Sequence, residues 1–307
     1  MKDIEEDAAG TGGGGSADAG GPVDEGQGGE APAVAEAQAQ AQAAEVEVAT
    51  TSEAVAALLA AGRRFVKKAD PASADPYLGF DISGYPGDAA MSAWWANSPL
   101  FFTGFYLAPA PNHSDTSWMS KRSYLANLGW GFAVVYVGRQ AGQSNLTYAQ
   151  GQADADNAST LAGNAGFPSL ATIFLDIETG GTLPNNLISY IQGWVAEIDG
   201  ISPYWAGVYC SYSSAAQIKT ALGSDHITFW CWHVDCPPSP GCTIPSTPPA
   251  PSGCGYSGAS VWQYAQSPEP GGISCSGYSG GQCSKTYGGY TLHVDLDTAS
   301  STNPSNG

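Results

Sequence analysis

Residues 172–211 read TIFLDIETGGTLPNNLISYIQGWVAEIDGISPYWAGVYCS, which is a strand, a helix and a second strand in succession. The apolar runs at 172–178 and 205–211 have the length of strands. Between them, residues 184–200 carry apolar side chains at helical spacing, start at a proline and end at a glycine. A strand, a helix and a strand in this order predict two parallel strands joined by a helical crossover.

The same alternation extends in both directions along the chain. Further apolar strands are predicted at 79–83, 101–107, 131–138, 227–234, 259–265 and 292–297, and further helices at 88–97, 120–130, 147–167 and 211–223. Eight such strands match the size of a closed (β/α)8 barrel of the TIM type. An open, doubly wound sheet is the main rival, but no Gly-x-Gly-x-x-Gly turn follows the first strand. The last two units lack clear helices, so the barrel is expected to be irregular there.

Composition divides the chain into three parts. Residues 1–76 are rich in Gly, Ala and Glu and poor in aromatic residues, which predicts a disordered acidic leader. Within the leader, 53–68 has apolar residues at helical spacing, so we expect a helix that serves as a linker or as a docking or export element. The barrel is expected over 77–300, and 301–307 is expected to be a flexible tail.

Charge and hydropathy exclude some classes of partner. The formal net charge is −18, and neither half of the chain carries the basic stripe that a nucleic acid requires. No apolar run is long enough to span a membrane, and the N-terminal residues lack the apolar core of a standard signal peptide.

Five of the seven cysteines fall in loops rich in Pro, Gly and Ser. These are Cys236, Cys242, Cys254, Cys275 and Cys283. At least two disulfides are expected among them, as in proteins exposed to an oxidising medium. Zinc is the rival interpretation, but no C-x2-C pair occurs. The other two, Cys210 and Cys231, lie in predicted strands and are interpreted as small buried hydrophobic residues.

Carboxylates mark the ends of three predicted strands. Asp81 ends the first strand, Asp176 and Glu178 end the fourth, and Asp295 lies in the eighth. Functional residues of such barrels lie at the carboxyl ends of the strands, so these four are expected at one mouth. Crowding raises the pKa of some of them, which supplies a proton donor beside an ionised group. That pair is what glycosidic cleavage needs.

Other polar and aromatic residues are assigned by position. Asp88 and Asp297 are expected only to cap a helix or bind solvent. Tyr209, Trp232 and Gln263 lie at strand ends and could supply flat apolar faces and polar tips for sugar rings.

Metal and serine chemistry are both disfavoured. His293 would share a strand face with Asp295, and His233 with Asp235, but no third ligand has fitting spacing. The sequence also lacks the G-x-S-x-G turn of many serine hydrolases. No metal and no cofactor are therefore expected.

Nine segments carry a family resemblance, in the order GFDIS (79–83), AMSAWW, TGFYL, GWGFAVVYVG, QADADNASTLAGNAGFP (152–168), TIFLDIE, GVYCS, WQY and VDLD (294–297). Together they resemble the glycoside-hydrolase-like barrel family of mycobacterial and other bacterial proteins. More distantly, the DIS, D-x-E, WQY and VDLD motifs look like glycoside hydrolase family 25, the peptidoglycan muramidases. That second resemblance implies Glu178 as general acid, Asp176 as the group that orients a substrate-assisted intermediate, and Asp81 and Asp295 as supporting carboxylates.

Two functions follow as hypotheses. The leading one is hydrolysis of β-1,4 linkages in a bacterial cell-wall glycan such as peptidoglycan, with retention through the substrate's own N-acetyl group. The alternative is a non-catalytic barrel that binds cell-wall polysaccharide. Delivery as an effector or cargo would fit either function. Both imply an extracellular or cell-envelope location, reached without a standard signal peptide.

Overall fold

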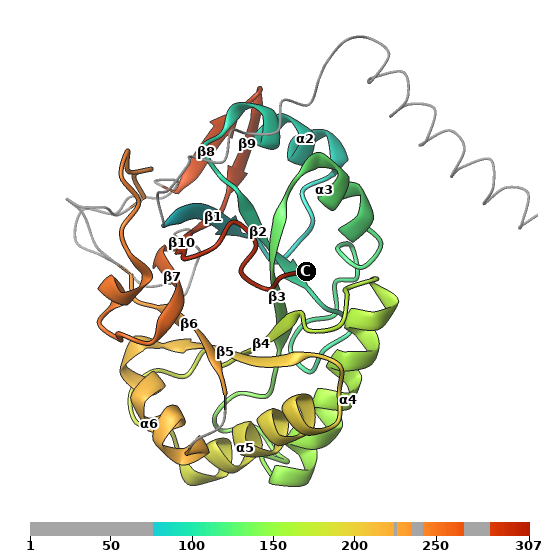
Figure 1. Cartoon of the computed structure of the whole chain (residues 1–307), viewed down its shortest axis with the longest axis vertical. Helices are drawn as coiled ribbons and strands as arrows, with labels where there is room; N and C mark the ends of the chain where they lie inside the picture. The colour runs from blue at the N-terminus through green and yellow to red at the C-terminus, as the bar shows by residue number, and fades with distance from the viewer. Residues whose placement is uncertain (1–75, 224–225, 235–241, 267–282) are drawn as a thin grey trace, which may run out of the picture. The chain divides into compact units, whose positions relative to one another are not determined.

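The computed structural model of the protein describes residues 76–223, 226–234, 242–266 and 283–307. Within them the chain forms a closed barrel with the strand order β1-β10-β7-β6-β5-β4-β3-β2 (Figure 1). The prediction of an α/β barrel is confirmed. The barrel strands are β1 (Tyr77–Asp81), β2 (Phe102–Tyr106), β3 (Gly131–Val137), β4 (Thr172–Asp176), β5 (Trp205–Ser211), β6 (Thr228–Trp232), β7 (Ala259–Ala265) and β10 (Asp295–Ala299).

Helices line the outside of the barrel between its early strands (Figure 1). In the described residues these are α2 (Asp88–Asn97), α3 (Arg122–Leu128), α4 (Tyr148–Asn164), α5 (Asn185–Gly200) and α6 (Tyr212–Leu222). Their ends follow capping chemistry: the Thr147 side chain accepts a hydrogen bond from the Gln150 N–H at the start of α4, and Gly129 ends α3 in a left-handed conformation. These helices provide the crossovers that keep the early strands parallel.

The eighth barrel strand, β10, differs from the others in direction. It runs antiparallel to both of its neighbours, β1 and β7. The expectation of a parallel eighth unit is therefore wrong. A parallel strand needs a crossover that returns the chain to the opposite end of the barrel. In the described residues between β7 and β10 there is instead the hairpin of β8 (Ser284–Tyr287) and β9 (Tyr290–His293), so the chain enters β10 from the mouth.

This hairpin also changes the position of a histidine. The predicted strand 292–297 merges the end of β9 with the start of β10. His293 belongs to the hairpin, where it is exposed and its ring contacts the Ser284 hydroxyl. The expected pairing of His293 with Asp295 on one strand face is therefore wrong, because β9 ends at His293 and β10 begins at Asp295.

Two apolar cores surround the barrel wall. One lies between strands and helices and holds the largest buried rings, among them Trp94, Trp118 and Trp194. The other fills the inside of the barrel and consists of Phe102, Ala133, Val135, Phe174, Tyr209, Trp230, Val261 and Ala299. The interior is thus packed with side chains, which leaves the polar groups of the strand ends at the mouth.

The last residues of the chain are bound to the opposite end of the barrel from the mouth. The Ser305 N–H donates to the Phe132 carbonyl, and the Thr172 N–H donates to the Ser305 carbonyl, each at 2.8 Å. The Val134 N–H donates to the Ser305 hydroxyl at 2.8 Å, and Ser305 is fully buried. Residues 301–307 are thus an ordered part of the barrel rather than the expected flexible tail, because they satisfy backbone groups at the starts of β3 and β4.

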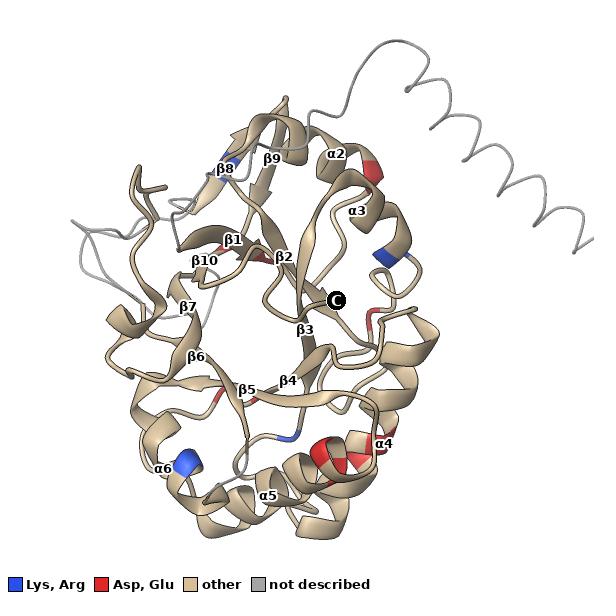
Figure 2. Ribbon diagram, viewed as in Figure 1, with Lys and Arg blue, Asp and Glu red and all other residues tan. Residues whose placement is uncertain are grey.

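The predicted leader, including its helix at 53–68, lies outside the described residues, apart from Pro76. Among the helices of the described part, none has the length and apolar character needed to cross a membrane. The Lys and Arg residues of that part are scattered over separate elements rather than gathered on one face (Figure 2). The absence of a nucleic-acid partner stays a prediction.

Candidate active site

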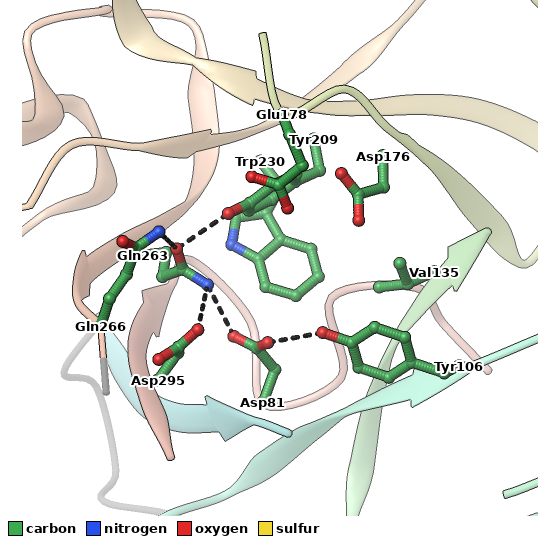
Figure 3. A pocket seen from close by; sticks show the side chains of 10 residues that line it. All are labelled: Asp81, Tyr106, Val135, Asp176, Glu178, Tyr209, Trp230, Gln263, Gln266 and Asp295. Atoms are coloured by element: carbon green, nitrogen blue, oxygen red, sulfur yellow. Dashed lines mark hydrogen bonds between the residues drawn. The ribbon is translucent and has the colours of Figure 1, made fainter. Parts of the chain in front are cut away.

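A polar pocket opens at the mouth of the barrel, where the parallel strands end and β10 begins (Figure 3). Its cavity volume is about 60 Å³. All four carboxylates predicted from the strand ends line it. The complete lining is Asp81, Tyr106, Val135, Asp176, Glu178, Tyr209, Trp230, Gln263, Gln266 and Asp295.

Asp81, the last residue of β1, accepts hydrogen bonds at both of its carboxylate oxygens. Its Oδ1 accepts a hydrogen bond from the Tyr106 hydroxyl at 2.7 Å, and its Oδ2 accepts one from Gln263 Nε2 at 2.9 Å. Burial raises the pKa of Asp81, while these hydrogen bonds lower it in part. The side chain is therefore fixed in one orientation inside the mouth.

Gln263 links the carboxylates to the aromatic side of the pocket. Its Nε2 faces Asp81 and also Asp295, whose Oδ2 is 3.5 Å away. Its Oε1 accepts hydrogen bonds from the Tyr209 hydroxyl at 2.8 Å and from Gln266 Nε2 at 3.1 Å. Since both the oxygen and the nitrogen of its amide form hydrogen bonds, the Gln263 side chain is held in one orientation in the pocket wall.

Asp176 and Glu178 form a second group on the opposite side of the pocket (Figure 3). Asp176 ends β4 and is 5% exposed, and its Oδ1 has no hydrogen-bond partner among the described residues. Burial raises the pKa of Asp176 well above its usual range, and the negative charges of Glu178 and Asp81 add to the rise. A buried acceptor without a donor is costly, so this oxygen is poised for a donor from a ligand.

Glu178 extends further toward solvent than Asp176. The residue as a whole is exposed, but its carboxyl group turns into the pocket (Figure 3). Burial of the carboxyl group raises the pKa of Glu178, the negative charge of Asp81 raises it further, and a hydrogen bond with Asp176 lowers it in part. Glu178 thus combines access from outside with a tendency to hold its proton, as a general acid requires.

The segment that carries both groups is held by Gln140, which lies just beyond β3. Gln140 Nε2 donates to the Asp176 carbonyl at 2.9 Å, and its Oε1 accepts from the Glu178 N–H at 2.8 Å. No sequence pattern pointed to Gln140. A glutamine after a strand end is no signal by itself, because the contact joins two loops that are distant in sequence.

Asp297 lies two residues beyond Asp295 on β10 and is fully buried. Its Oδ1 accepts a hydrogen bond from Trp230 Nε1 at 3.1 Å, while its Oδ2 has no partner among the described residues. Burial and the negative charge of Asp81 raise the pKa of Asp297 well above its usual range. The expectation that Asp297 binds solvent is wrong, because the antiparallel strand carries it down into the barrel.

Asp88 does not cap α2 as expected, because Gly87 is the N-cap and no side-chain hydrogen bond caps the helix. It is the first residue of α2, where a negative charge complements the helix dipole, and it forms an ion pair of 3.1 Å with Lys121.

Of the three predicted sugar-contacting residues, Tyr209 and Gln263 line the pocket and Trp232 does not. Trp230 lines it instead. Both tryptophans lie on the same face of β6 because side chains alternate along a strand, so the sequence could not separate them. Trp232 lies nearer the rim, where its ring is 3.2 Å from the position of a Cβ atom on Gly180. A role in sugar binding stays a prediction for all three.

A disulfide joins Cys242 and Cys283, two of the five loop cysteines. The sulfur of Cys283 lies 2.9 Å from the carbonyl oxygen of Gln266, whose side chain lines the pocket. Cys254 is a free thiol, and Cys236 and Cys275 lie outside the described residues. The predicted disulfide chemistry is thus confirmed for one pair. In the described part of the chain, no group of three or more His, Cys, Asp or Glu is arranged to hold a metal ion.

Residues 92–236, from within α2 to just beyond β6, match the family described as the Rv2525c-like, glycoside hydrolase-like domain. This match confirms the first family resemblance inferred from the sequence. None of the curated proteins matches the chain.

Solved structures of similar fold include an uncharacterized protein of B. stearothermophilus, at 21% identity over 73% of this chain and 95% of that one, with a TM-score of 0.48. The Tat-secreted protein Rv2525c of Mycobacterium tuberculosis, in complex with L-tartrate, is 16% identical over 72% of this chain and 94% of that one, with a TM-score of 0.46. A family GH25 lysozyme of Aspergillus fumigatus is 16% identical over 74% of this chain and 94% of that one, with a TM-score of 0.44.

Proposed function

We propose that this barrel, which matches a glycoside hydrolase-like domain over residues 92–236, hydrolyses β-1,4 linkages of a bacterial cell-wall glycan. The observation that carries the proposal is the pair formed by Asp176 and Glu178. Two carboxyl groups with raised pKa values leave one strand end and face two further carboxylates across a small pocket. A protonated acid beside ionised groups is the equipment of glycosidic cleavage.

In the proposed reaction, Glu178 donates its proton to the glycosidic oxygen as the bond from that oxygen to the anomeric carbon breaks. The exposed position of Glu178 lets the leaving sugar depart toward solvent. Asp81 assists from a distance, because its negative charge raises the pKa of Glu178 and so keeps the proton in place.

Asp176 has the complementary task. Its unpartnered Oδ1 accepts the N–H of the substrate's 2-acetamido group, which turns the acetamido carbonyl oxygen toward the anomeric carbon. That oxygen forms a bond to the carbon as the leaving group departs. Water then opens the cyclic intermediate from the face the leaving group occupied, with Glu178 taking the proton of the water. Two displacements at one carbon retain its configuration.

The alternative is a barrel that binds cell-wall polysaccharide without cleaving it, whether as a wall protein or as a delivered effector or cargo. The same pocket could hold a sugar without cleaving it. The family match is to a hydrolase-like domain, and a fold does not establish an activity. Under either function we place the protein outside the cytoplasm, in the medium or cell envelope. The Cys242–Cys283 disulfide supports an oxidising compartment.

The experiment is digestion of purified peptidoglycan, followed by borohydride reduction and identification of the new reducing ends. Cleavage like that of a muramidase releases fragments that end in N-acetylmuramic acid. Fragments that end in N-acetylglucosamine would assign the other glycosidic bond and contradict the muramidase-like role. Binding to the same material in a pull-down, with no new ends released, would favour the binding barrel.

A further inference from the structure

Three cysteines from separate elements meet on the outer side of the barrel wall. Cys210 on β5 and Cys231 on β6 are register partners of neighbouring parallel strands. Cys254 ends the short 3-10 helix η1 (Pro251–Cys254) in the connection between β6 and β7. All three are fully buried, and the Cys231 thiol lies within hydrogen-bond reach of the other two.

The surroundings of these thiols do not suit a reactive cysteine. They belong to the core between strands and helices, and the Cys254 sulfur accepts a hydrogen bond from the Tyr256 N–H at 3.4 Å. Contact between the thiols, together with burial, raises the pKa of Cys231 and of Cys254. A thiolate is the reactive form of cysteine, so in the folded protein these thiols are shielded from reagents.

We propose that Cys231 and Cys254 become joined by a disulfide when the protein folds in an oxidising medium, and that Cys210 remains a thiol. The choice of pair follows from geometry. Neighbouring strands are about 4.8 Å apart and their register partners point the same way, whereas the two Cβ atoms of a disulfide are about 3.8 Å apart. A bond from Cys210 to Cys231 would therefore require β5 and β6 to move closer together than their normal spacing. Cys254 belongs to η1 in the connection between β6 and β7, so a bond from it to Cys231 would not join two neighbouring strands.

The reaction needs a two-electron oxidant, for which a small disulfide such as glutathione disulfide suffices. The Cys254 thiolate attacks one sulfur of that disulfide and releases one glutathione thiolate. The Cys231 thiolate then attacks the Cys254 sulfur of the mixed disulfide and releases the second. Two protein thiols lose two protons and two electrons in total, and one glutathione disulfide becomes two glutathione thiols.

The bond would hold the connection between β6 and β7 at a second point. The Cys242–Cys283 disulfide already fixes this connection to the segment before β8. A bond at Cys254 would fix its other end to β6, just ahead of β7, the strand that supplies Gln263 to the pocket. The proposal does not depend on the glycosidase activity.

Peptide mapping tests the pairing. The reduced, unfolded protein is refolded in a glutathione redox buffer, and free thiols are then blocked with N-ethylmaleimide in denaturant. Pepsin suits the digestion, because no Lys or Arg lies between Lys219 and Lys285 and acid suppresses disulfide exchange. We expect a linked peptide pair that contains Cys231 and Cys254, and maleimide on Cys210.

Two variants sharpen the test. Cys254→Ser should leave Cys231 open to maleimide and lower the Tm by about 5–10 °C. The matched variant Cys210→Ser should keep the linked pair and remove only one labelled thiol. Maleimide on both Cys231 and Cys254 in the refolded wild type would overturn the proposal. So would a linked pair that joins either of them to Cys210, Cys236 or Cys275. If Cys254→Ser does not fold, the peptide map of the refolded wild-type protein alone decides which cysteines are paired.

Discussion

Asp81 on β1 and Asp295 on β10 are register partners in an antiparallel strand pair. The first residue of one strand therefore lies beside the last residue of the other, and both carboxylates reach the same mouth. Gln263 stands between them and donates toward both. The pocket thus draws its charged groups from strands at opposite ends of the barrel sequence, and the negative charge of Asp81 helps to raise the pKa values of Asp176 and Glu178.

Replacing the proposed acid tests the mechanism directly. Glu178→Gln keeps the shape of the side chain but cannot donate a proton to the leaving oxygen, so turnover on peptidoglycan should fall by about 10²-fold or more. Glycan binding and Tm should be retained. Asp156→Asn, an exposed change on α4, serves as the control for loss of one negative charge. An unfolded Glu178→Gln variant would show that the residue is structural and contradict its assignment.

The role of Asp81 can be determined from the pH dependence of kcat/KM. Activity requires the protonated form of Glu178, so the rate should fall as pH rises through its pKa. Asp81 raises that pKa through its negative charge. Removing the charge in Asp81→Asn should lower the pKa of Glu178 and move the alkaline limb of the profile to lower pH. A limb that stays in place while the rate falls would mean that Asp81 contributes only to packing.

Asp297 should make the fold less stable as pH rises. Its pKa is raised in the folded protein, so between the unfolded value of about 4 and the folded value the native state binds the extra proton. The stabilising contribution is therefore fully present below about pH 4 and is lost as pH rises through the folded pKa.

Asp297→Asn removes this titration and retains an oxygen for the Trp230 N–H. Urea unfolding at several values between pH 4 and pH 8 should give a flatter dependence for the variant than for the wild type. Parallel curves for the two proteins would refute a raised pKa at this position.

Deleting residues 303–307 should destabilise the barrel, although it removes nothing from the pocket. The deletion leaves the N–H groups of Phe132, Val134 and Thr172 without their partners. The Phe132 carbonyl also loses the Ser305 N–H. At about 1 kcal/mol for each of these four hydrogen bonds, the free energy of unfolding should fall by about 4 kcal/mol. Denaturant unfolding measures the loss. Asn306→Gly, at an exposed residue with φ of 53°, should change little and serves as the control.

The sequence was sufficient for what depends on regular patterns. Strand and helix periodicity located β1 to β7, and the rule that parallel strands present their carboxyl ends at one mouth brought Asp81, Asp176 and Glu178 together. Asp295 was expected there for another reason, as part of a parallel strand. It reaches the mouth because it begins an antiparallel one.

What the sequence did not indicate depends on contacts that carry no local signal. The direction of β10 follows from a hairpin that replaces a crossover, and the burial of Asp297 follows from that direction. The Gln140 side chain forms hydrogen bonds with the backbone of Asp176 and Glu178, which lie far from it in the sequence. The choice between Trp230 and Trp232 depends on depth in the barrel, which strand alternation leaves open.

The closure of the barrel by β10 bears on how the protein is made. β1 is synthesised first among the barrel strands, yet one of its edges is covered only by β10, through the pairing that runs from Tyr77 with Ala299 to Asp81 with Asp295. Until the ribosome has released β10, the nascent chain presents two open strand edges, on β1 and on β7, that can pair with other chains. The protein should therefore depend on holding chaperones late in translation, and ribosome-bound chains stalled before β10 should aggregate more readily than chains stalled after the barrel has closed.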